Sequence, residues 1–144
     1  MSKTTTIADC KIIDLRKYRA PQGTITPIEG GGGDIPFEIK RVLYQYDVPG
    51  GESRGAHVHI KDQQFLIAVS GSFEVMIDDG KNRDIITLKQ PYYGLLIPPG
   101  IWSAEQGFSS GSVCLVLTDA IYSATDYIRD YDEFLKYKGC DVRE

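Results

Sequence analysis

The sequence predicts an all-β fold, a sandwich or small barrel, followed by one α-helix at the C-terminus. Short segments rich in β-branched and aromatic residues recur along the chain, and turn residues separate them. Apolar residues recur at helical spacing only near the end of the chain. With 144 residues, the chain is most simply one domain, residues 1–144, with a core at about 11–120 and a helix at about 124–137.

The predicted strands cover residues 37–46, 64–69, 73–77, 84–88, 92–97 and 113–118. Pro49-Gly50-Gly51 ends the first of them. Phe73, Val75 and Ile77 alternate with other residues, as expected of a strand with one buried face. Asp79-Gly80 then signals a hairpin into the next strand. Regularly spaced strands of this kind are typical of a sandwich or barrel.

The C-terminal segment has a different pattern. Ser123-x-x-Asp126 resembles a helix N-cap with a carboxylate that reaches back to it. Helical spacing relates Tyr127, Ile128, Tyr131, Phe134 and Leu135. One amphipathic helix is therefore expected here, packed on the sheet.

Composition excludes several classes of function. The net charge is -4 with dispersed Lys and Arg, so no basic stripe is available for nucleic acid. No apolar run approaches the ~18 residues of a membrane span, and no secretory segment is apparent. Cys10, Cys114 and Cys140 are far apart and lack CxxC spacing. Reduced thiols and a cytoplasmic location are expected.

The two histidines are the most informative residues. His57 and His59 stand two positions apart in a strand-like segment, so both side chains face the same side. They are the only histidines in the chain. Such a pair is either half of a metal site or an acid/base pair.

The spacing around the histidines resembles the first cupin motif. The matching residues are Gly51, His57, His59, Gln64 and Gly71. Metal-binding cupins carry Glu where this chain has Gln64. The resemblance implies a cupin, a jelly-roll-like β-barrel.

The second cupin motif is visible over residues 94–103, with a shorter first spacer and with Ser103 in place of its histidine. A transition metal held by protein needs three or four N, O or S donors, and an amide and a hydroxyl are poor replacements. We therefore expect no metal and no other cofactor.

A purely structural role for the histidines would leave polar groups buried without need, so acid/base use is favoured. Arg54 is placed to neutralise a phosphate or an oxyanion.

Four motifs together give a sharper resemblance. They are residues 35–42, Arg54-Gly55-x-His57-x-His59, residues 99–102 and residues 125–134. Over roughly residues 11–138 the chain resembles the sugar nucleotide 3,4-ketoisomerases, RmlC-like cupins that act on dTDP-4-keto-6-deoxyglucose. The resemblance implies a metal-independent homodimer that moves a ketone from C4 to C3 through an enediol. The product would supply 3-amino deoxysugars for a surface polysaccharide such as O-antigen, or for a natural product.

The resemblance also implies roles for individual residues. His57 and His59 would transfer the proton between carbons and protonate an oxygen, in an order left open, and Tyr44 would polarise a sugar oxygen unless it only packs in its strand. The expected substrate-binding residues are Arg41, Arg54, Gln64, Trp102 and Ser103. Trp102 would line the pocket or fill the barrel mouth.

Some alternatives stay open. Gln22 and Ser103 stand where relatives often carry basic residues, so the gluco or galacto configuration of the product is undecided. The sequence also leaves open whether the nucleotide carries thymidine or uridine. The competing functions are a metal-dependent cupin enzyme, a nucleotide-sugar 3,5-epimerase and a non-catalytic sugar-binding cupin.

Overall fold

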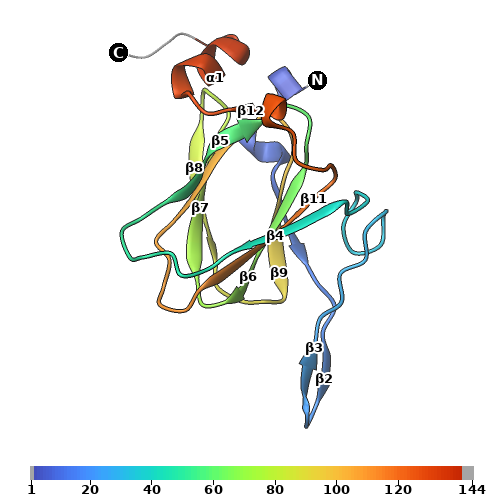
Figure 1. Cartoon of the computed structure of the whole chain (residues 1–144). Helices are drawn as coiled ribbons and strands as arrows, with labels where there is room; N and C mark the ends of the chain where they lie inside the picture. The colour runs from blue at the N-terminus through green and yellow to red at the C-terminus, as the bar shows by residue number, and fades with distance from the viewer. Residues whose placement is uncertain (1, 141–144) are drawn as a thin grey trace.

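Two five-stranded antiparallel sheets face each other and form a barrel in the computed structural model, which describes residues 2–140 (Figure 1). The first sheet runs, in spatial order, β1 (Lys11–Asp14), β9 (Tyr93–Ile97), β6 (Gln64–Ser70), β11 (Val113–Thr118) and β4 (Arg41–Gln45). The second runs β12 (Tyr127–Ile128), β5 (Arg54–His59), β10 (Trp102–Gln106), β7 (Phe73–Asp78) and β8 (Arg83–Leu88). The predicted all-β class is confirmed.

The strand patterns explain how the barrel closes. Inward-facing residues of β6, β7 and β11, among them Leu66, Val75 and Val116, form the largest core cluster between the sheets. The Asp79-Gly80 hairpin is confirmed: β7 pairs with β8, and the Asp79 amide donates to the Asn82 carbonyl. Apolar side chains of this cluster fill the space between the two sheets.

The strand predicted at residues 37–46 is shorter in the structure and begins at Arg41. Phe37 instead packs in a second core cluster, and its carbonyl accepts a hydrogen bond from the Gly31 amide. The glycine run at residues 30–33 makes this turn possible, because a Cβ at Gly30 would lie 2.7 Å from the Phe37 oxygen.

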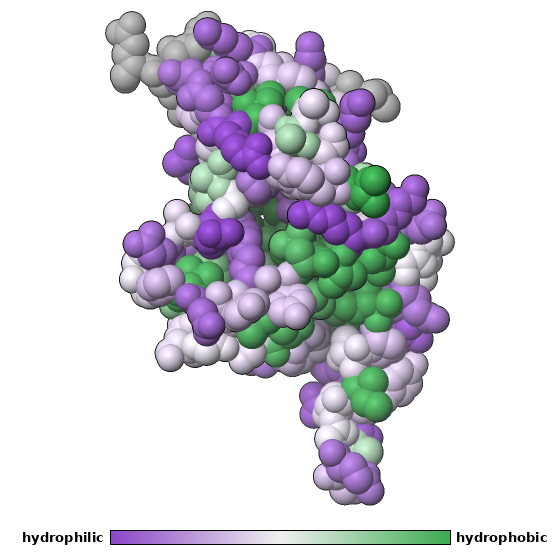
Figure 2. Space-filling model, in the orientation of Figure 1, coloured by the Kyte–Doolittle hydropathy of each residue, from purple (hydrophilic) through white to green (hydrophobic). Residues whose placement is uncertain are grey.

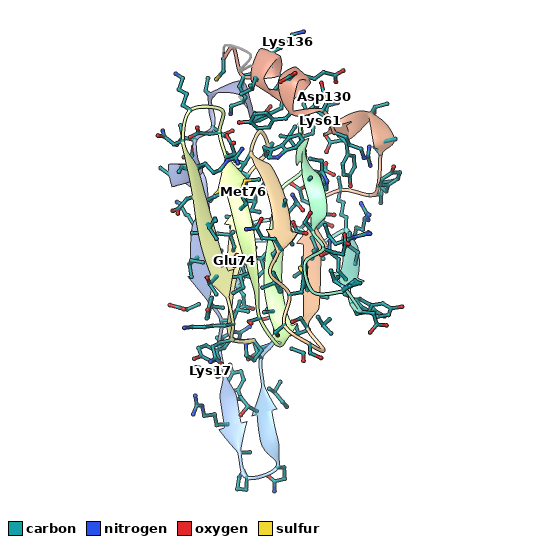
Figure 3. The ribbon with its side chains drawn as sticks, turned by 90° about the vertical axis from the view of Figure 1, so that its left-hand side faces the viewer. Lys17, Lys61, Glu74, Met76, Asp130 and Lys136 are labelled. Atoms are coloured by element: carbon teal, nitrogen blue, oxygen red, sulfur yellow. The ribbon has the colours of Figure 1, made fainter. Side chains whose placement is uncertain are left out.

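The helix predicted at about 124–137 is wrong in its first half. A single 3₁₀ turn, η3 (Ala124–Asp126), is followed by β12, and α1 begins at Tyr131 and ends at Tyr137. The chain stays extended at residues 127–128 because these residues pair with β5. Asp130 caps α1 by accepting from the Glu133 amide. Figure 3 shows Lys61 and Asp130 together at the end of the barrel that α1 covers.

A hairpin arm extends from the other end of the barrel. It consists of β2 (Tyr18–Ala20) and β3 (Gly23–Ile25), which form a separate two-stranded sheet. The arm leaves the body of the molecule in Figure 1, and Lys17 marks its base in Figure 3. Two large side chains on it, Tyr18 and Ile25, are exposed to solvent.

Within residues 2–140, no helix has the length and apolar character of a membrane span. Cys10, Cys114 and Cys140 are free thiols, as the sequence predicts.

Candidate active site

A cavity of about 370 Å³ lies between the two sheets. It lies between β4 and β11 of one sheet and β5 and β10 of the other, and the segment after η3 borders it. The view in Figure 2 looks onto this side of the molecule, where polar residues surround a hollow above β4. Its wall contains Arg41, Leu43, Gln45, Arg54, Gly55, Ala56, His57, His59, Gln64, Glu105, Val116, Thr118, Tyr122, Tyr127 and Arg129.

Strand β5 brings both histidines into this wall. Their Nε2 atoms lie 3.1 Å apart, within hydrogen-bond distance. The register of β5 and β10 shifts between Ser103 and Glu105, and Gly55 adopts a φ of +72° beside the shift. A β-branched or bulky residue would be strained there, so this glycine lets β5 bend before it presents His57 and His59.

Two buried aspartates lie behind His59. Asp126 Oδ2 is 3.3 Å from His59 Nδ1, and Asp62 Oδ2 is 3.8 Å from the same atom. The second oxygen of Asp126 accepts a hydrogen bond of 2.7 Å from the Lys61 amide. Asp126 is thus fixed by the backbone and holds the imidazole of His59 in place.

These contacts select a tautomer for each imidazole. A carboxylate only accepts, so His59 Nδ1 donates to Asp126 and His59 Nε2 keeps its lone pair. His57 Nε2 then donates to His59 Nε2, which leaves a lone pair on His57 Nδ1. The chain of hydrogen bonds therefore makes His57 a base with its own proton turned toward His59.

The environment keeps this base neutral. Burial, followed by the neighbouring His59 and Arg129, lowers the pKa of His57 to about 3. Burial also lowers the pKa of His59, and the hydrogen bond to Asp126 opposes that shift. Burial and the charges of Asp126 and Asp119 raise the pKa of Asp62 to about 6. At neutral pH both imidazoles are therefore uncharged.

Cationic and aromatic side chains surround the cavity next to the histidines. The Tyr127 ring lies 4.8 Å from that of His57 and 4.4 Å from that of His59, between centroids. Arg41 donates to the Tyr127 hydroxyl at 3.3 Å, and the Arg129 guanidinium lies 4.6 Å from the Tyr127 ring centroid. Two guanidinium groups at one rim suit an anionic ligand such as a diphosphate.

The structure brings most of the predicted site residues together. Arg41, Arg54 and Gln64 lie in the cavity wall with both histidines. Gln64 occupies the position of the cupin carboxylate and is buried.

Three predicted site residues lie elsewhere. Tyr44 is 61% exposed on the outer face of β4, because Arg41, Leu43 and Gln45 take the inner face. This corrects the prediction that its hydroxyl reaches a sugar beside His57. Trp102 packs against Val58 and Phe134 under α1, so it fills space and does not line the cavity. Ser103 is paired with His57 across the sheet and is buried outside the wall.

Several residues of this site were not predicted from the sequence, among them Asp62, Asp126, Tyr127 and Glu105. Asp126 and Tyr127 were assigned to a helix, whereas η3 and β12 turn them toward β5. Glu105 could have been found from strand alternation, because it follows Ser103 by two positions on the inner face of β10.

His59, Asp62 and Asp126 also carry the donor atoms of a conceivable metal site, all within 4.8 Å of one another. Neither aspartate lines the cavity, so an ion there would be separated from a bound ligand by His59. Asp126 already bonds the imidazole and a backbone amide. This arrangement fits carboxylates that orient a histidine.

Comparison with known proteins gives consistent matches. The family model described as "FdtA: WxcM-like, C-terminal" matches residues 8–139. The chain is 43% identical over 127 residues to TDP-4-oxo-6-deoxy-alpha-D-glucose-3,4-oxoisomerase from Aneurinibacillus thermoaerophilus, covering 88% of this chain and 91% of the relative.

Solved structures agree with these matches. A 3,4-ketoisomerase from Helicobacter canadensis is 40% identical with a TM-score of 0.88, covering 91% of this chain and 98% of that one. A histidine-to-asparagine variant of the 3,4-ketoisomerase QdtA from Thermoanaerobacterium thermosaccharolyticum, in complex with TDP-4-keto-6-deoxyglucose, is 37% identical with a TM-score of 0.88, covering 91% and 94%.

Proposed function

Because the chain belongs to the FdtA family of sugar nucleotide 3,4-ketoisomerases, which have a cupin barrel, we propose that it converts a dTDP-linked 4-keto-6-deoxyhexose into the 3-keto isomer. The observation that carries this proposal is the neutral, hydrogen-bonded pair His57–His59 in a cavity with a cationic rim. The reaction proceeds without a metal. It also supplies the ketone that amination at C3 requires, so the product serves 3-amino deoxysugar synthesis for a surface polysaccharide or a natural product.

The chemistry follows from the acidity of the hydrogen on C3 next to the C4 ketone. His57 removes that proton through Nδ1, and the electron pair forms an enediolate with its charge on the C4 oxygen, which takes up the proton of the C3 hydroxyl. The hydrogen bonds to His59 and Asp126 stabilise the imidazolium that forms. Returning the proton to C4 leaves the ketone at C3. His57 thus transfers the proton between the carbon atoms, and His59 holds the His57 imidazole in the orientation that this requires.

The rest of the cavity suits the nucleotide. Arg41 and Arg129 stand beside Tyr127, and Arg54 adds a third cation to the wall. The diphosphate contacts these guanidinium groups, and the Tyr122 ring, 5.6 Å from Tyr127 between centroids, extends the aromatic surface next to them. The sugar then lies toward the histidines.

Incubating the protein with dTDP-4-keto-6-deoxyglucose in deuterated buffer tests the proposal. We expect NMR to detect a 3-keto product that carries solvent deuterium at C4, at an undiminished rate in the presence of a chelator. Deuterium at C3 and C5 without movement of the ketone would indicate a 3,5-epimerase. Loss of turnover with the chelator would indicate a metal-dependent enzyme, and binding without turnover a sugar-binding protein.

We also propose a homodimer. The outer face of the first sheet exposes large side chains, including Val42, Tyr44 and Val69. A groove of about 550 Å³, lined in part by Ile67 and Leu115, lies at the base of the arm. Figure 2 shows apolar residues gathered over β4 and a further one on the arm. A second copy of the chain would cover both surfaces.

The cytoplasmic location predicted from the thiols stays a prediction.

Replacing Ile25 on the arm with lysine tests the dimer. We expect light scattering to report twice the chain mass for the unmodified protein and a single chain for Ile25→Lys, because a charge cannot be buried unpaired in an apolar interface. Ile85→Lys is the matched control, since Ile85 is an exposed isoleucine on β8 of the other sheet. A monomeric unmodified protein would contradict the proposal.

A further inference from the structure

Glu105 is a buried carboxyl group in the cavity wall that the histidine chemistry does not use. It is 5% exposed and lies on β10, one inward-facing position beyond Ser103, the partner of His57 in the sheet. Among residues 2–140, no Lys, Arg or His nitrogen lies within ion-pair distance of it. A buried, unpaired carboxylate is costly, so the site favours the neutral acid.

Gln45 on β4 is the hydrogen-bonding neighbour of Glu105. Its Nε2 lies 3.0 Å from Glu105 Oε1, while its own Oε1 is buried and has no hydrogen-bond partner among residues 2–140. Both side chains line the cavity. A buried acceptor without a donor costs free energy, so the hydrogen bonds of this pair are not complete within residues 2–140. Gln45 and Glu105 therefore form a polar subsite in the cavity wall.

The backbone of β5 leaves room for the Glu105 carboxyl group. A Cβ at Gly55 would lie 2.8 Å from Glu105 Oε2, so the glycine lets the carboxyl group sit against β5. The groups that face Glu105 from the surrounding strands are Arg54 and His57 of β5, Gln45 of β4 and Cys114 of β11. Burial raises the pKa of Glu105 to about 7, and Gln45 and Arg54 oppose the shift.

A 3,4-ketoisomerase must move two protons. One passes from C3 to C4, and the other passes from the hydroxyl on C3 to the oxygen on C4. A carboxylic acid is suited to the second transfer, because one of its oxygens donates a proton while the other accepts one. The two sugar oxygens are on adjacent carbons, so a single carboxyl group can reach both.

We propose that Glu105 is a second catalytic residue, which transfers the hydroxyl proton between the oxygens on C3 and C4 of the sugar; this rests on the proposed function. As His57 breaks the C3–H bond, the C3–C4 double bond forms and the C4 oxygen takes the proton of Glu105. Glu105 then takes the proton from the C3 hydroxyl, the C3 carbonyl forms, and C4 takes its proton from His57. Both residues end in their starting states.

The test compares Glu105→Gln with the unmodified protein, using dTDP-4-keto-6-deoxyglucose in deuterated buffer. We expect kcat for the 3-keto product to fall about 10²-fold, with dTDP affinity within about twofold, since a neutral amide is close in shape to the acid. Exchange of the C3 hydrogen should fall less than product formation, because His57 is intact. Glu74→Gln is the matched control: Glu74 lies on the adjacent β7, bonded to Gln106 outside the cavity.

A pH profile of the unmodified protein provides a second measurement, independent of how the variant folds. Only the neutral acid donates, so kcat should decline as pH rises through about 7, the pKa of Glu105. Normal kcat in Glu105→Gln, or a flat profile through this range, would overturn the inference. An unmodified protein that forms no 3-keto product would instead overturn the proposed function.

Discussion

Replacing His57 with asparagine is expected to lower kcat for the 3-keto product about 10⁴-fold. Asparagine keeps a polar side chain of similar reach but has no basic nitrogen at neutral pH. The deprotonation of C3 would then depend on water. The measurement is the rate of product formation by NMR, together with exchange of the C3 hydrogen in deuterated buffer, and both should fall together.

The control for this variant is ligand binding. His57 lies beside the cationic rim but carries no charge at neutral pH, because its pKa is about 3. Affinity for dTDP, measured by calorimetry, should therefore stay within a few-fold of the unmodified protein. A variant that binds dTDP normally and still exchanges the C3 hydrogen at the original rate would show that another group is the carbon base.

Strand alternation explains both the success and the failure of the sequence predictions. The two-residue spacing of His57 and His59 predicted a shared face, and the structure confirms it. The same rule was not applied to β4. Arg41 and Tyr44 are three positions apart, so they point to opposite sides of a strand. The structure directs Arg41 inward and Tyr44 outward.

Other parts of the site depend on long-range pairing, which a single sequence does not reveal. Asp126 is 67 positions from its partner His59. Its segment carries an apolar spacing typical of a helix, but residues 127–128 are extended and pair with β5. Glu105 is a different case: strand alternation would have indicated it, but its strand, β10, was not predicted.

Trp102 shows how one feature can have two explanations until the fold is known. A single tryptophan near a cupin motif is compatible with a pocket wall or with the core. The ring lies 5.3 Å from that of Tyr131 and 5.7 Å from that of Phe134, between centroids, so it supports α1 on the outside of β10. The helix in turn keeps the η3–β12 segment, and with it Asp126, against β5.

Replacing Asp126 with asparagine is expected to lower kcat about 10³-fold while the fold is retained. The asparagine oxygen can still accept from the Lys61 amide. Its NH₂ group, however, donates to His59 Nδ1 and so moves the proton of His59 to Nε2. His59 Nε2 then donates to His57 Nε2, and the remaining proton of His57 moves to Nδ1. The base loses its free lone pair without any change in size.

Nitrogen-15 NMR of labelled histidine would detect this reversal of both tautomers, a readout that a purely structural role of Asp126 would not change. Asp62→Asn is the matched control. Asp62 lies farther from His59, at 3.8 Å, and its pKa of about 6 makes the neutral form accessible near neutral pH. The amide should therefore reduce kcat less than about fivefold. Equal losses in the two variants would indicate that the negative charge near His59, and not the tautomer imposed by Asp126, controls the rate.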